Sequence, residues 1–137
     1  MSSLSYLHWR KSSVLNQMET TRSSIANTDE KIERLRQALH EISSTHSDME
    51  SVKRSINSLN IDQSSWRGEK ENEFDDHYNH YEDSVKSYIS KVEDAQETIR
   101  DDINRYETEK ASYTSSLNHL ESSLHSLNWQ IRVEQRE

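Results

Sequence analysis

Gly68 is the only glycine in this 137-residue chain, and the chain contains no proline. Glycine takes a positive φ most easily, and glycine and proline are the strongest interruptions of regular structure, so the chain has one marked break. The residues just before it are rich in Asn, Asp and Ser, whose side chains hydrogen-bond the backbone and favour turns. We therefore predict a turn at residues 61–68 between two halves of similar length.

Apolar and aromatic residues recur at spacings of three and four on both sides of this turn, which is the period of an amphipathic helix. The first half carries Leu7, Leu15, Met18, Ile25, Ile32, Leu35, Leu39, Ile42, Met49, Val52, Ile56 and Leu59. The second half carries Phe74, Tyr78, Tyr81, Val85, Tyr88, Val92, Ala95, Ile99, Ile103, Tyr106, Lys110, Tyr113, Leu117, Leu120, Leu124, Leu127 and Ile131. The pattern predicts one helix at about 3–60 and a second at about 69–134.

The two stripes match each other when the chain folds back on itself. In an antiparallel pair, facing residues have numbers with a constant sum, and a sum near 134 sets Ile42 against Val92 and His46 against Tyr88. We therefore predict an all-α fold, a long antiparallel two-helix hairpin that resembles a coiled coil and forms a single domain over residues 1–137. Because two helices share only one narrow seam, we expect a second hairpin, either a copy or another protein, to complete a four-helix bundle.

Composition agrees with a narrow seam. Hydrophobic residues make up 30% of the chain, which is low for a compact core, and charged residues make up 31%. The net charge is −8, and residues 69–109 hold 14 acidic against 5 basic side chains. Nucleic acid is therefore a poor partner. We interpret the acidic stretch as a solvated helix face, with a basic protein partner as the alternative.

The sequence contains no apolar run long enough to span a membrane and no apolar core of a signal peptide. We expect a protein made in the cytoplasm, whose export would use a route without a cleaved signal peptide. No triad or paired-carboxylate arrangement can be argued for two helices without a pocket, so we predict no enzymatic activity and no cofactor.

Histidines and tyrosines are the remaining candidates for chemistry. Asp76, His77, His80 and Asp83 lie near one another on the second helix, but this spacing also arises on a solvated face, so we predict no metal site. His46 is predicted to hydrogen-bond Tyr88 across the seam. The seam tyrosines, five of the six in the chain, are predicted to pack in the core.

Two tryptophans near the chain ends are candidates for partner contacts. With Leu127 and Ile131 facing inward, Trp129 lies on the outer face and Val133 extends the same apolar strip. Trp9 is likewise outward on the other helix, although the two outer faces point away from each other and need not form one patch. Exposed tryptophan is typical of interface anchors, so we name Trp129, Val133 and Trp9 as a candidate partner surface.

The turn also carries a motif. Trp66 and Gly68, followed by Phe74, resemble the Trp-x-Gly turn of the small helical hairpins handled by bacterial type VII secretion. In length the chain is most similar to their YwqH-like branch, whose members are associated with LXG-type toxins. The Tyr-x-x-x-Asp/Glu export signal of related hairpins has its spacing here only at Tyr78 and Glu82, close to the turn, which favours a protein that travels with another cargo.

The resemblance implies a binding module, an accessory or co-secreted partner of an LXG-type toxin, whose helical N-terminal domain or another small hairpin would be the partner. A homodimer remains open. The alternative is a structural coiled-coil protein, an oligomerisation or spacer element unrelated to secretion.

Overall fold

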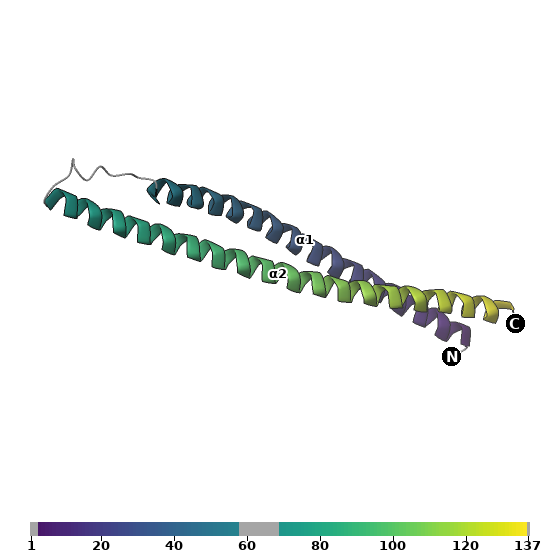
Figure 1. Ribbon diagram of the computed structural model, residues 1–137. Helices are drawn as coiled ribbons and strands as arrows, with labels where there is room; N and C mark the ends of the chain where they lie inside the picture. The colour runs from purple at the N-terminus through teal and green to yellow at the C-terminus, as the bar shows by residue number, and fades with distance from the viewer. Residues whose placement is uncertain (1–2, 58–68, 137) are drawn as a thin grey trace. The chain divides into compact units, whose positions relative to one another are not determined.

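The computed structural model describes residues 3–57 and 69–136, with the side chains of 69–72 and 74 excepted. The described residues form two α-helices, α1 at Ser3–Asn57 and α2 at Glu69–Arg136. The start of α1 and the end of α2 lie at the same end of the pair (Figure 1). The predicted all-α helical hairpin is confirmed. The predicted turn at 61–68 lies outside the described residues.

Both helices are long because nothing in the described residues interrupts them. Each lacks glycine and proline, and several of their threonines, which are weak helix formers, bond back to the helix. Thr28 Oγ1, for example, donates to the Ser24 carbonyl at 2.8 Å. Ion pairs one turn apart, such as Arg34 with Glu30 at 2.5 Å, support the exposed faces.

Residue contacts divide the chain into two compact units, and the division cuts across both helices. Unit 1 contains the chain up to Arg34 together with the chain from Ile103 on, and unit 2 contains Leu35–Asp102. Each unit therefore pairs one stretch of α1 with one stretch of α2.

The core of unit 1 is aliphatic. It consists of Leu7, Val14, Met18, Leu127 and Ile131, with Leu4, Leu117, Leu120 and Leu124 packed against it. The prediction that Leu15 belongs to this seam is wrong, since Leu15 is 43% exposed and its neighbour Val14 is buried. Val14 follows Leu7 by seven residues and precedes Met18 by four, so it continues the heptad pattern that Leu15 leaves.

The core of unit 2 is smaller. Ile56, Val85 and Ile89 are buried, and Met49, Val52 and Tyr78 pack against them. The hydroxyl of Tyr78 donates a hydrogen bond to the backbone carbonyl of Ile56. The Tyr78 side chain therefore packs in the seam while its hydroxyl group is hydrogen-bonded.

The prediction that five tyrosines pack in the seam is wrong for two of them. Tyr81 is 55% exposed and Tyr88 is 49% exposed. Ile89, one residue after Tyr88 and four after Val85, is buried instead. The aliphatic side chain takes the inward position because it leaves no hydroxyl to satisfy. Tyr78, Tyr106 and Tyr113 are partly buried.

The pairing of the helices departs from the predicted one at three polar contacts and keeps it at a fourth, between Tyr78 and Ile56. Three polar contacts between the helices show this, each with a partner on α2 five residues beyond the predicted one: Asp29 with Lys110 at 2.6 Å, Ser43 with Gln96 at 3.1 Å, and His46 with Glu93 at 3.3 Å. Five residues exceed one helical turn of about 3.6 residues, so these contacts do not correspond to a slip of the apolar stripes by one turn.

The Asp29–Lys110 pair gives a test of this register. Reversing either charge, by Asp29→Lys or Lys110→Asp, should lower the free energy of unfolding by about 0.5–1 kcal/mol, because like charges then meet on half-exposed side chains. The double reversal should restore it, as measured by urea unfolding at low salt. The control pairs Asp29→Lys with Arg105→Asp, the partner in the predicted register, and should show no restoration. Restoration in the control alone would overturn the observed register.

Gln96 gives a second test, because it is a buried polar side chain in unit 2, only 7% exposed, and donates to the Ser43 hydroxyl. Gln96→Ala should lower the free energy of unfolding by about 1–3 kcal/mol, since it removes buried contact and a hydrogen bond. The pair Ser43→Ala with Gln96→Leu should regain that stability, because no polar atom is left unpaired. The exposed Gln17→Ala serves as control and should change stability by less than about 0.5 kcal/mol.

Candidate partner surface

The residues of the turn motif cannot be placed in the structure. Trp66 and Gly68 lie outside the described residues, and Phe74 is in α2 with its side chain outside them. The proposed roles of these three residues stay predictions from the sequence.

The two outward tryptophans are both in unit 1. Trp9 is 62% exposed and Trp129 is 59% exposed, while Val133 is partly buried. An indole ring is the largest apolar side chain, and leaving two of them in water is unfavourable. Both tryptophans are therefore exposed at the end of the helix pair where α1 begins and α2 ends.

Tyr6 connects these tryptophans, and the sequence analysis missed it. Its ring stacks on Trp9 with the ring centroids 6.2 Å apart and an interplanar angle of 27°, and it is 48% exposed. The Arg10 guanidinium lies 6.0 Å from the Tyr6 ring centroid. Tyr6 and Trp129 line one groove of about 260 Å³ together with Val133.

The expectation that the two tryptophans need not share a patch is therefore corrected. Trp9 stacks on Tyr6, and Tyr6 shares a groove with Trp129, so one connected set of side chains links the two helices. We call Tyr6, Trp9, Trp129 and Val133 the aromatic surface. The i, i+3 spacing of Tyr6 and Trp9 is the signal that could have revealed it from sequence.

A larger groove continues from Trp9 along unit 1. It measures about 780 Å³ and runs between the helices, with Leu120 as an apolar contributor. Its other lining residues are uncharged or histidine: Ser12, Ser13, Asn16, Gln17, Thr20, Thr21, Ser116, His119 and Ser123. Short polar side chains of this kind leave room for a neighbouring helix and offer hydrogen bonds to it.

The acidic stretch of α2 is less organised as a binding surface. Within it Lys86 pairs with Glu82 at 2.9 Å, and the hydrogen bond and charge of Glu82 raise the pKa of Lys86 above its ordinary value. Asp76, His77, His80 and Asp83 are exposed. Within residues 3–57 and 69–136 they do not form a group of three converging metal ligands.

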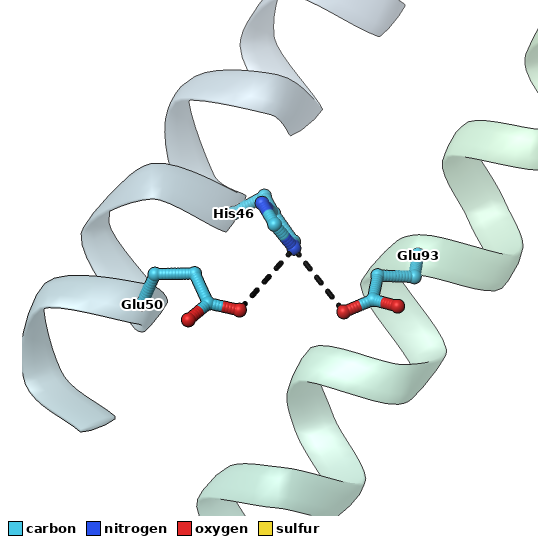
Figure 2. A group of neighbouring side chains, drawn as sticks. All are labelled: His46, Glu50 and Glu93. Carbon is cyan, nitrogen blue, oxygen red and sulfur yellow. Dashed lines mark hydrogen bonds and ion pairs between the residues drawn. The ribbon is translucent and has the colours of Figure 1, made fainter. Parts of the chain in front are cut away.

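A different set of titratable side chains does converge, in unit 2. His46 Nε2 lies 3.3 Å from Glu93 Oε1 and 3.7 Å from Glu50 Oε1 (Figure 2). The predicted partner of His46 was Tyr88, which is wrong, because α2 presents Glu93 to the imidazole and leaves Tyr88 exposed. The observed pairing therefore sets the Glu93 carboxylate beside His46 in place of the Tyr88 phenol.

With this geometry in place, comparison with known sequences gives a family. The sequence profile of the YwqH-like family matches residues 10–129. The chain belongs to the YwqH-like family. No curated protein and no solved structure matches it. The family match begins after Trp9 and ends at Trp129, so Tyr6, Trp9 and Val133 lie outside it.

Neither α1 nor α2, over the residues described, contains a stretch both long and apolar enough to cross a membrane.

Proposed function

We propose that this YwqH-like chain is a non-enzymatic helical binding module, an accessory or co-secreted partner of a type VII, LXG-type toxin. Family membership and the Trp-x-Gly motif of the sequence support the biological setting. The observation that carries the binding role is the exposure of the aromatic surface, where three large rings in unit 1 meet water instead of the core.

The energetics favour a partner at this surface. An aromatic side chain can bury about 150–250 Å², of which about half is open to a partner here, and the transfer of apolar area from water is worth about 25 cal/mol per Å². Tyr6, Trp9 and Trp129 together therefore provide several kcal/mol of gross binding energy, before the costs of association. Aromatic rings at a groove edge are typical anchors for a partner helix.

The partner is proposed to be helical, either the N-terminal domain of the toxin or another small hairpin. The grooves beside the aromatic surface run along the helices, and their short polar side chains allow close approach. A helix laid there would contact both α1 and α2 within unit 1 and contribute to a bundle. No reaction is assigned, because these grooves are open to solvent and a reaction site must exclude water.

A structural coiled-coil protein is the second candidate, and the small cores favour it. The buried core cluster of unit 1 has five members, so a second copy of the chain could also cover the aromatic surface. This candidate is an oligomerisation or spacer element with no toxin partner. A neighbouring LXG-type toxin gene supports the first candidate, and its absence supports the second.

The test is capture of the adjacent-gene toxin by purified chain, with mass measured by light scattering. The variant Tyr6→Ser, Trp9→Ser and Trp129→Ser should reduce capture at least tenfold, because it removes the apolar anchors. The matched control, Tyr81→Ser with Tyr88→Ser, changes exposed rings of unit 2 and should capture as the unmodified chain does.

Two outcomes would contradict this function. Equal capture by the triple variant, with helix content intact by circular dichroism, would place the partner elsewhere on the molecule. Self-association that the triple variant abolishes, with no toxin bound by any form, would establish the structural alternative.

A further inference from the structure

The polar cluster of unit 2 draws its side chains from both helices. His46 and Glu50 are one turn apart on α1, and Glu93 reaches them from α2 (Figure 2). One nitrogen and two carboxylate oxygens, one from each residue, all lie within 4.8 Å of one another. The three donor atoms face a common point between the helices.

Their separations fit a small metal ion. Zinc binds imidazole nitrogen and carboxylate oxygen at about 2.0–2.2 Å, so two ligand atoms at tetrahedral positions are about 3.3–3.6 Å apart. The distances from His46 Nε2 are 3.3 Å to Glu93 and 3.7 Å to Glu50. Small side-chain rotations would bring the two carboxylates into place.

One hydrogen on His46 Nε2 cannot serve both carboxylates. Nε2 of an imidazole carries at most one hydrogen, yet two carboxylates lie near that same atom. Two like charges held this close also repel each other. A divalent cation would accept one electron pair from each of the three atoms and neutralise both carboxylates.

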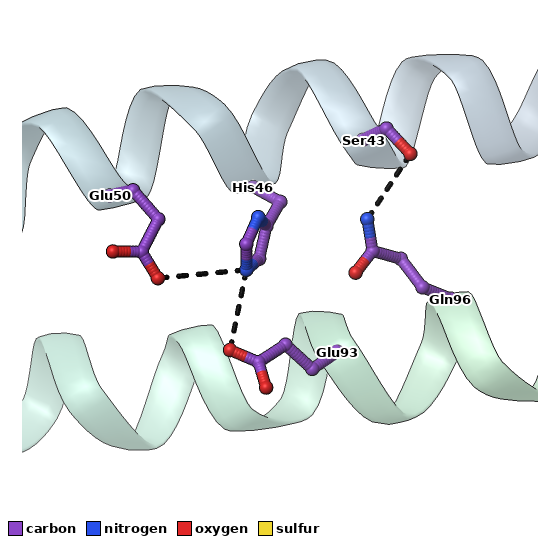
Figure 3. Close-up of polar contacts among 5 residues, drawn as sticks. All are labelled: Ser43, His46, Glu50, Glu93 and Gln96. Atoms are coloured by element: carbon purple, nitrogen blue, oxygen red, sulfur yellow. Dashed lines mark hydrogen bonds and ion pairs between the residues drawn. The ribbon is translucent and has the colours of Figure 1, made fainter.

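The surroundings hold the donors in register and leave the site accessible. Next to the cluster, Gln96 of α2 donates to Ser43 of α1 at 3.1 Å, which ties the helices together beside the site (Figure 3). The His46 side chain is 26% exposed and that of Glu93 is 55% exposed. An ion can therefore enter from solvent, and water can fill the fourth position of a tetrahedral site.

We propose that His46, Glu50 and Glu93 bind one divalent transition-metal ion, with Zn²⁺ the best match, and that this ion joins α1 to α2 in unit 2. Calcium and magnesium suit the site less well, because they prefer oxygen ligands alone. Since the ion binds only the paired helices, its binding stabilises unit 2 against unfolding.

The test is titration of chelator-treated full-length chain with Zn²⁺, followed by calorimetry and by thermal unfolding. One equivalent should bind and raise the melting temperature, because the ion binds the folded unit and not the unfolded chain. His46→Gln, Glu50→Gln and Glu93→Gln should each weaken binding at least tenfold. The matched control, His77→Gln with His80→Gln, changes two exposed histidines of α2 and should bind as the unmodified chain does.

Glu93→Gln is the decisive variant, because Glu93 is the ligand from α2 and the substitution preserves the size of the side chain. Unchanged affinity in this variant would mean that any ion is held by α1 alone, which overturns the proposal. Failure of the unmodified chain to bind Zn²⁺ at 1 mM, about the weakest useful affinity, would also overturn it. Tetrahedral Co²⁺ absorption in the unmodified chain, absent in Glu93→Gln, would support the interhelical site independently.

Discussion

A single narrow seam between two helices is the constraint on which this structure depends. Among the side chains that the structure describes none is fully buried, and the two cores contain five and three buried apolar residues. Helices longer than fifty residues fold with so little core because each turn adds its own backbone hydrogen bonds and a small share of the seam. Stability is therefore distributed along the helix pair. A single polar contact contributes a larger share of the free energy of unfolding than it would in a globular core.

The helices and their antiparallel pairing could be predicted because the apolar period continues across both halves of a chain with one glycine. The register could not. The apolar stripes do not specify which polar side chains meet beside the seam. Apolar matching set Asp29 opposite Arg105, and the structure pairs it with Lys110 at 2.6 Å. Charged and amide side chains thus specify how α1 aligns with α2, which hydrophobic burial alone does not decide.

The same ambiguity explains which site residues were missed. Trp9 and Trp129 could be named from the heptad count, because an outward position does not depend on the register of the partner helix. The neighbours of His46 do depend on it, and the predicted pairing, five residues away on α2, set Tyr88 in the place of Glu93. Tyr6 escaped notice for another reason, because tyrosine is common both in seams and on surfaces, and only its stacking on Trp9 reveals its place.

The two units differ in how their polar and apolar groups are arranged, and this difference suggests separate roles. Unit 1 buries aliphatic side chains between its helices and exposes Tyr6, Trp9 and Trp129, so its surface has binding energy to offer a partner. Unit 2 places Gln96, Ser43 and His46 between its helices, where polar groups lower stability but fix the register. Its stability is therefore the more sensitive to an ion bound at the cluster around His46. Partner binding would stabilise the folded state through unit 1, and metal binding would do so through unit 2, which makes the two linkages separable by experiment.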